Sequence, residues 1–207
     1  MRGYEAYPEY RDSEENWLGM VPCNWEVIHG RRIFENRREA PYVTDVQLSA
    51  SQKYGVVPQE VMMAMEQSKV MLAIKGTTSF RHVEKDDFVI SLRSFEGGIE
   101  HSYYNGCASP AYTVLAPKDG VYPDYFRFLF KSSQYISALQ ATTDSLRDGK
   151  SITYEQFGSI SVALPSKSEQ VKIANFLDHE TAKIDTLIEK QQQLIKLLKE
   201  KRQAVIS

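Results

Sequence analysis

The stretch "LPSKSEQVKIANFLDHETAKIDTLIEK", from Leu164 to Lys190, begins a helical pattern that continues to Ser207 without a glycine or another proline. The spacing of Ser166 and Glu169 is typical of a capping box, which starts a helix sharply. A helix of roughly 40 residues is near 60 Å long at about 1.5 Å per residue, longer than a small domain is wide. The sequence therefore predicts a boundary at Pro165, with a globular domain over residues 1–165 and a long helix over residues 166–207.

The long helix carries an apolar stripe with the seven-residue repeat of a coiled coil. Its predicted pairing residues are Leu177, Ile184, Leu187, Ile188, Gln191, Leu194, Ile195, Leu198 and Val205. Glu180, Gln191 and Lys201 are polar at seam positions, and such residues fix the register of a pairing at a cost in stability. Because the helix outruns its own domain, most of the stripe must find a partner outside that domain.

Composition and charge exclude little. The chain has 207 residues, a net charge of −2, and two cysteines, which offer at most one disulfide and suit a reducing compartment. No apolar run approaches the roughly 20 residues of a membrane span, and the N-terminus lacks an apolar signal region. We expect a cytoplasmic protein without a membrane partner, whose contacts with nucleic acid would come from local patches.

Residues 1–165 predict an α+β fold: a mixed globular domain with a β-rich core and peripheral helices, followed by the coiled-coil-forming helix. A short helix is expected over 24–40, with its arginines on one or two faces. A Gly-Gly hairpin is expected within 92–106, and another helix over 121–143. Strands are expected at 42–49, 70–74, 87–92, 111–117 and 159–164.

The sequence offers no catalytic constellation. The four histidines stand apart from any spacing that would close a metal shell, so we expect no metal site. Neither a nucleotide-binding glycine loop nor a Gly-x-Ser-x-Gly elbow is present. Glu84, Asp86 and Asp87 cluster on an expected turn, where a solvated surface is the commoner reading. We therefore expect a protein that is not an enzyme and holds no cofactor.

Two polar loops favour binding instead, because hydroxyls and cations on loops match what phosphates and base edges accept. One loop surrounds Gly76 and the other surrounds the Gly97-Gly98 pair. The candidate DNA-binding residues are Lys75, Thr77, Thr78, Ser79, Arg81, Arg93, Ser94, Phe95, Tyr103 and Tyr104. Polar loops are common, so this pattern alone is a weak signal.

Four stretches resemble the DNA-specificity subunit of type I restriction-modification systems, in particular its N-terminal half. They are "NWLGMVPCNWEV" (Asn16–Val27), "DFVISLRSFEGGIE" (Asp87–Glu100), "GCASPAYTVLAP" (Gly106–Pro117) and the helical stretch from Leu164 to Ser207. The most specific part is Pro-x-x-x-Glu-Gln-x-x-Ile-Ala-x-x-Leu-Asp, from Pro165 to Asp178. Cys107 departs from the bulkier aliphatic residue that the family often has.

This resemblance implies a non-catalytic reader with a target recognition domain over 1–165. In such families one recognition domain binds one half of a bipartite site in double-stranded DNA, and a long helix spaces it from a second. Methyltransferase (modification) subunits, which hold S-adenosylmethionine, dock on the helices, and a restriction subunit joins the complex. Here one domain and one helix stand where the full subunit has two of each. Antiparallel pairing with a second copy or second half would complete the reader.

Two other interpretations stay open on the residues alone. A structural adaptor would use the apolar stripe to recruit a helical protein partner. A stand-alone methyltransferase is disfavoured because the chain lacks a cofactor loop.

Overall fold

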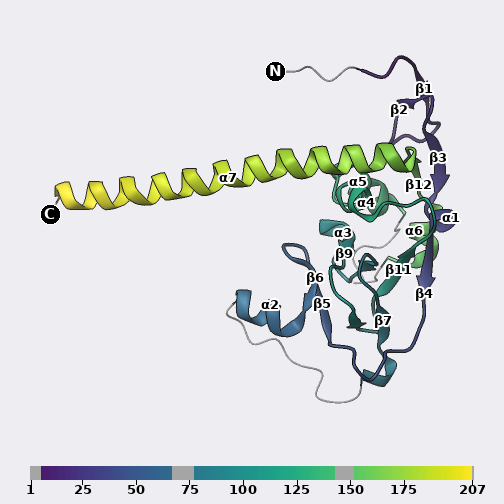
Figure 1. Ribbon diagram of the computed structural model, residues 1–207, viewed down its shortest axis with the longest axis horizontal. Coiled ribbons are helices and arrows are strands. Elements are labelled where there is room, and N and C mark those ends of the chain that lie inside the picture. The colour runs from purple at the N-terminus through teal and green to yellow at the C-terminus, as the bar shows by residue number, and fades with distance from the viewer. Residues whose placement is uncertain (1–5, 67–76, 143–151, 207) are drawn as a thin grey trace.

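Figure 1 shows the computed structural model, which describes residues 6–66, 77–142 and 152–206. A domain of short strands and helices is followed by one helix that extends far beyond it. The strands are β1 (Tyr10–Asp12), β2 (Met20–Pro22), β3 (Glu26–His29), β4 (Phe34–Arg37), β5 (Leu48–Ser51), β6 (Gly55–Pro58), β7 (Arg81–Val83), β8 (Phe88–Ile90), β9 (Glu100–His101), β10 (Gly106–Ala108), β11 (Thr113–Pro117) and β12 (Ser161–Leu164). The helices are α1 (Gly30–Ile33), α2 (Gln59–Glu66), the 3-10 turn η1 (Thr77–Ser79), α3 (Ser94–Gly97), α4 (Pro123–Leu129), α5 (Ser133–Ala141), α6 (Tyr154–Ser159) and α7 (Lys167–Ile206).

The centre of the domain is a four-stranded antiparallel sheet in the order β4-β11-β8-β9. In its middle, Val114 of β11 lies opposite Arg37 on one side and Val89 on the other. All three residues of β8 are fully buried, as expected for a strand that is covered on both faces. Two-stranded ladders β1-β2, β3-β12, β5-β6 and β7-β10 complete the β structure. The predicted α+β class is confirmed.

An aromatic cluster forms the main core. The rings of Phe34, Phe88, Phe126, Phe130 and Phe157 meet with centroids 5.1 to 5.8 Å apart, mostly edge to face. Such ring pairs are each worth about 0.5 to 1.5 kcal/mol beyond the area they bury. Because these residues come from β4, β8, the α4 region and α6, the cluster joins segments far apart in the sequence.

Several predicted elements are present where the apolar pattern placed them. Strands β8, β11 and β12 lie within the predicted ranges, and α7 covers nearly all of the predicted long helix. The predicted helix over 121–143 is instead two helices, α4 and α5. The break is stabilised by Ser132, whose hydroxyl accepts a hydrogen bond from the backbone N–H of Tyr135 and so caps α5.

Other local predictions are wrong. Residues 24–40 form β3, one turn of helix and β4 rather than a helix, because β12 and β11 pair with these segments and supply hydrogen bonds from across the domain. The predicted strand over 42–49 begins only at Leu48, and Tyr42 starts a turn. The predicted Gly-Gly hairpin is an antiparallel pairing of β8 with β9, but its connection holds the short helix α3. The strand predicted at 70–74 lies outside the described residues.

The capping box is also replaced by a tertiary contact. The backbone carbonyl of Ser166 accepts from the N–H groups of Glu169 and Gln170, which starts the helix as expected. The Glu169 carboxylate, however, accepts hydrogen bonds from Tyr7 and Trp25 rather than returning to Ser166.

Among residues 6–66, 77–142 and 152–206, no helix combines the length and the apolar character that a membrane span requires.

Candidate nucleic-acid interface

The β5-β6 hairpin lies on the side of the domain toward which α7 extends (Figure 1). Leu48 and Val56 bury the body of the hairpin in a second apolar cluster. The turn over residues 52–54 is largely polar, and its Gln52 and Lys53 side chains face solvent. It ends at Gly55, whose φ of +73° lies in the left-handed region that favours glycine. The hairpin therefore presents polar side chains on a rigid base.

A cleft of about 440 Å³, the Arg93 cleft, lies on one side of this turn. Gln52 donates a hydrogen bond to the carbonyl of Arg93 at 3.4 Å, which links the turn to the loop after β8. The described lining contains two cations and no carboxylate, so the charge in the cleft is positive. It is lined by Ala50, Ser51, Gln52, Lys53, Met62, Ser91, Leu92, Arg93 and Tyr112.

A second cleft of about 350 Å³, the His101 cleft, lies on the other side of the turn. Two of its three cations are neutralised: Lys131 contacts Glu100 at 2.5 Å, and Arg127 contacts Asp124 and Asp178, whereas Lys53 is shared with the Arg93 cleft. Burial raises the pKa of Glu100, although Lys131 opposes the rise. The His101 cleft is lined by Gln52, Lys53, Tyr54, Gly55, Ile99, Glu100, His101, Tyr103, Arg127, Phe128 and Lys131. The two clefts thus differ in charge, and the Arg93 cleft is better suited to an anion.

The predicted loop over 93–104 meets this surface at several points. Arg93 lines one cleft and Tyr103 lines the other, and both side chains are exposed. Tyr104 is exposed nearby. Ser94 is buried, and its hydroxyl accepts a hydrogen bond from the backbone N–H of Ser91, so it shapes the loop. Phe95 belongs to α3, and its side chain lies outside the described residues.

The predicted loop over 75–81 lies elsewhere. Thr77, Thr78 and Ser79 form η1, and Arg81 begins β7, at the end of the domain farthest from α7 (Figure 1). Thr78 and Ser79 are exposed and Arg81 is half-buried, whereas Lys75 and the Thr77 side chain lie outside the described residues. The structure therefore does not gather the two predicted loops into one site.

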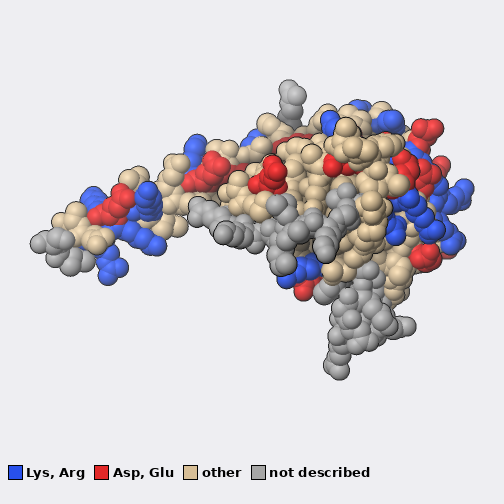
Figure 2. Space-filling view, turned by 90° about the horizontal axis from the view of Figure 1, so that it is seen from below, with Lys and Arg blue, Asp and Glu red and all other residues tan. Residues whose placement is uncertain are grey.

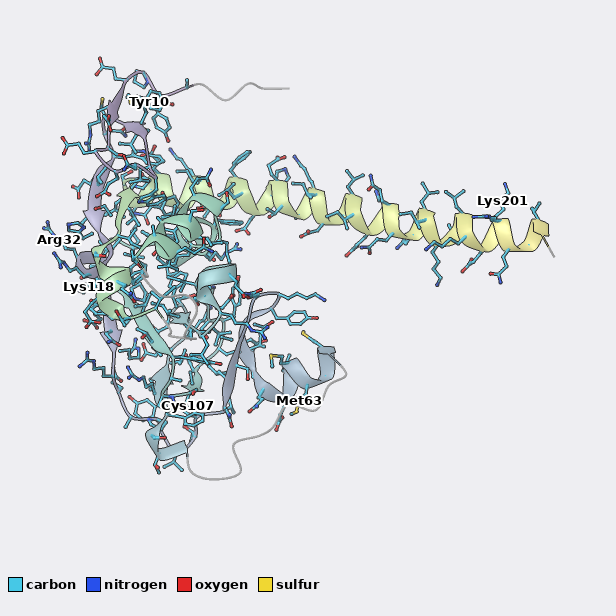
Figure 3. All side chains as sticks on the ribbon, turned by 180° about the vertical axis from the view of Figure 1, so that it is seen from behind. Tyr10, Arg32, Met63, Cys107, Lys118 and Lys201 are labelled. Carbon is cyan, nitrogen blue, oxygen red and sulfur yellow. The ribbon has the colours of Figure 1, made fainter. Side chains whose placement is uncertain are left out.

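Exposed cations gather along the edge opposite the free end of α7. Figure 2 shows this group, and Figure 3 shows Arg32 and Lys118 on this edge. Arg31, Arg32, Arg38 and Lys118 are exposed, and Glu35 and Glu39 are interspersed among them. This edge is mixed in charge.

Arg37, which the sequence places among the same arginines, is instead an internal ion-pair hub. Its guanidinium contacts Asp87 at 2.7 Å, Glu84 at 2.8 Å and Glu39 at 2.9 Å. Burial raises the pKa of Asp87 to about 6, and the hydrogen bond from Arg37 opposes that rise. The predicted carboxylate cluster at residues 84–87 therefore serves structure, with Asp87 buried and Glu84 half-exposed.

The helix surface is the second feature of functional interest. Beyond Thr181 every described side chain of α7 is exposed, including the apolar stripe. Of the predicted pairing residues, Leu177 is half-buried against the domain, and Ile184, Leu187, Ile188, Gln191, Leu194, Ile195, Leu198 and Val205 are exposed. Leu197 is a further exposed apolar residue beside them.

Sequence reasoning missed Gln52, Lys53 and Arg127. The stretch from Ser51 to Gly55 carried a weak signal, because polar residues ending in a glycine are typical of a turn, and the β-branched Val56 and Val57 follow it. Arg127 carried none, since only the packing of α4 against β9 and α7 brings it to the His101 cleft.

Metal-ligating side chains and cysteines are the remaining candidate features in the described part of the chain. Across its three ranges, no group of three His, Cys, Asp or Glu side chains could hold a metal ion. Cys23 is exposed and Cys107 is buried, and both are free thiols.

The fold and surfaces define a class of protein: a β-rich domain with a polar, partly cationic rim, attached to a long helix whose distal apolar side chains are exposed. The chain belongs to the family of type I restriction modification DNA specificity domains, whose pattern it matches over residues 22–197. No curated protein matches the sequence significantly.

Solved structures share the fold. The chain is similar to the HsdS subunit from Thermoanaerobacter tengcongensis, with a TM-score of 0.54, 13% identity, and coverage of 86% of this chain and 41% of that one. It is also similar to a chain from a structural study of the assembly and conformational transition of the type I R-M system. There the TM-score is 0.62 with 16% identity, covering 89% of this chain and 45% of the other. This chain thus spans less than half the length of these neighbours.

Proposed function

We propose that this chain is a non-catalytic DNA reader that recognises one half of a bipartite site within a type I restriction-modification complex. The observation that carries the proposal is the family match over residues 22–197, which includes both the β-rich domain and most of α7. The chain itself would hold no cofactor. S-adenosylmethionine would belong to the modification subunits that dock on it, and a restriction subunit would join through the complex.

The Arg93 cleft and the adjoining hairpin turn form the surface that we assign to DNA. Arginine can donate two hydrogen bonds to a guanine edge or a phosphate, and lysine and glutamine complement it on the groove edges. Arg93, Lys53 and Gln52 provide these groups from a rigid hairpin and a neighbouring loop. The His101 cleft, where Arg127 and Lys131 are neutralised by carboxylates, would contribute Tyr103 as a flanking contact.

The exposed stripe of α7 fits antiparallel pairing with a second copy or second half of the specificity subunit. From Asp178 to Gln191 the helix holds four acidic and two basic residues, whereas from Gln192 to Ile206 it holds one acidic and four basic residues. Antiparallel pairing places the acidic segment of each helix beside the basic segment of the other, and parallel pairing places like charges together. The charge pattern therefore favours the antiparallel arrangement.

DNA binding is tested with the chain assembled with its modification subunits, using the sequence that the complex methylates. We expect Arg93→Ala to weaken specific binding or relax one base preference, at a cost of about 1 to 3 kcal/mol, roughly 5- to 150-fold. Arg32→Ala, on the opposite edge, is the matched control and should change the affinity little.

The salt dependence of binding separates this function from the adaptor alternative. A reader's affinity for DNA falls steeply as ionic strength rises, because protein cations release counterions from the phosphates. If the complex binds no DNA at any ionic strength, while its intact helix still recruits a helical protein, the result would favour the structural adaptor. Equal effects of the two arginine substitutions would refute the assignment of the Arg93 cleft.

A further inference from the structure

The first turns of α7 are held by a buried glutamine whose polar atoms are all used. Gln170 is 1% exposed. Its amide nitrogen donates to the carbonyls of Gly120 at 3.0 Å and Pro165 at 2.9 Å, and its amide oxygen accepts from the N–H of Tyr122 at 2.8 Å. One side chain thus joins the helix to the loop before α4 and to Pro165, in the connection between β12 and α7.

Glu169, the neighbouring residue, joins the helix to the N-terminal segment. Its carboxylate accepts hydrogen bonds from the Tyr7 hydroxyl and from the indole N–H of Trp25, the latter at 3.0 Å. The rings of Tyr7 and Trp25 also pack edge to face, with centroids 5.6 Å apart. This contact lies on a different side of the helix from Gln170, since consecutive helical residues point about 100° apart.

A third contact follows two turns later on the face of Gln170. Ala174 is fully buried in the main core, and Asp178 forms an ion pair with Arg127 of α4. Residues four apart share one face of a helix, so Gln170, Ala174 and Asp178 form one line against the domain. Contacts at both ends of this line, with Glu169 to the side, restrain both the direction of α7 and its rotation about its own axis.

We propose that Gln170 and Glu169 are positioning residues that fix the direction of α7 relative to the DNA-reading domain, and thereby the separation of the two half-sites. This inference rests on the proposed function. The helix of 40 residues is about 60 Å long, so a tilt of about 5° at its root displaces the far end by about 5 Å. That displacement corresponds to one or two base pairs at about 3.4 Å each, so a loosened root changes the preferred spacing.

The first test measures the direction of α7 without DNA. Spin labels are placed at Lys118→Cys and Lys190→Cys in a Cys23→Ser background, so that one label lies about 35 Å along the helix from its root. Labelled chain is diluted with unlabelled chain to remove signals between copies. The parent should give one narrow distance, and Glu169→Ala/Gln170→Ala should give a broader or shifted distribution. Asn175→Ala, an exposed change on the same helix, is the control.

The second test measures the preferred spacing. The complex with modification subunits is given DNA in which two half-sites are separated by variable lengths, and methylation is read by sequencing. We expect the double variant to keep the half-site sequence but to accept additional spacings or shift its optimum by about one or two base pairs. A loss of activity at every spacing, without a change in preference, would indicate a merely structural role and overturn the inference.

The two tests fail in distinguishable ways. An unchanged distance distribution in the folded double variant would overturn the positioning role, whatever the DNA result. Absence of DNA binding by the parent complex would overturn the proposed function and the spacing claim with it, while the distance measurement would still decide whether the residues fix the helix. If the double variant loses its circular dichroism signal, Glu169→Ala alone, at a half-buried position, takes its place in both tests.

Discussion

The two ends of α7 obey opposite rules of burial. At the root, polar Gln170 is buried because each of its polar atoms has a partner in the domain. In the distal part, apolar residues such as Leu194 and Ile195 are exposed, because the described part of the domain does not cover them. The comparison shows that one continuous helix has two parts with different surroundings: a root held by the domain, and a distal part whose apolar side chains are exposed. We propose that the root fixes the direction of the helix and that the distal part binds a partner.

Energetics sharpens the contrast. Fully burying a leucine or isoleucine is worth about 1.5 to 3 kcal/mol relative to exposure, so burying the exposed stripe against a partner would stabilise the pair strongly. In proteins, most of the stability of a helix comes from packing of its apolar face rather than from helix propensity. We therefore expect substitutions at the root to act on the folding of one chain, and substitutions in the stripe to act on association.

The largest expected effect is from placing a charge in the root. Ala174→Glu puts a carboxylate into the main core, where Ala174 is fully buried. We expect a loss of about 4 kcal/mol in the free energy of unfolding, because burying an unpaired ion costs several kcal/mol. Urea denaturation measures it, with the exposed Gln193→Glu as control. Equal stability of the two variants would break the distinction between root and distal helix.

An effect on association rather than on the folding of one chain is expected from charges in the stripe. Leu194→Asp/Ile195→Asp should weaken self-association at least about 100-fold, since two apolar contacts of about 1.5 to 3 kcal/mol each are lost. Analytical ultracentrifugation over a concentration series measures this, while circular dichroism checks the helix. Gln193→Asp, outside the stripe, should associate normally. A parent chain that sediments as a monomer at micromolar concentration, with its helix intact, would rule out pairing with a second copy.

Truncating the buried glutamine comes next. Gln170→Ala leaves the N–H of Tyr122 and the carbonyls of Gly120 and Pro165 without their partner, at a cost of about 1 to 3 kcal/mol. Chemical denaturation of the monomeric stripe variant isolates this loss from association. A change below a few tenths of a kcal/mol would mean that water replaces the lost bonds, and the root would be looser than its contacts indicate.

The smallest effect concerns the contact of Tyr7 with Glu169 at high pH. Burial and the hydrogen bond to Glu169 raise the pKa of Tyr7 to about 12 from an ordinary value of 10.0. Because the folded-state pKa is the higher one, the contribution is fully present below pH 10 and is lost as the pH rises to about 12. The unfolding midpoints of the parent and Tyr7→Phe should therefore converge over that interval. A constant difference across it would show that the hydroxyl does not titrate with this contact.

Local sequence patterns predicted some elements well and others poorly, for a physical reason. The stripe of α7 and the buried strands β8 and β11 follow from apolar periodicity, which each segment carries by itself. Residues 24–40 looked helical, yet they form β3 and β4 because β12 and β11, distant in sequence, supply their ladder partners. The candidate site was predicted in the same uneven way: Arg93 and Tyr103 reach the rim, whereas Ser94 is buried and η1 lies at the far end of the domain.

The sequence by itself predicted a β-rich domain up to Pro165 and a long helix with an apolar stripe after it, because periodicity and helix-start signals are local. Its motifs also indicated the family. Only the tertiary structure decided how that helix is aimed. Glu169 carries a local signal for a capping box, but its carboxylate binds Tyr7 and Trp25, which the chain brings from more than 140 residues away. The direction of α7 depends on those long-range contacts, and no local pattern can encode them.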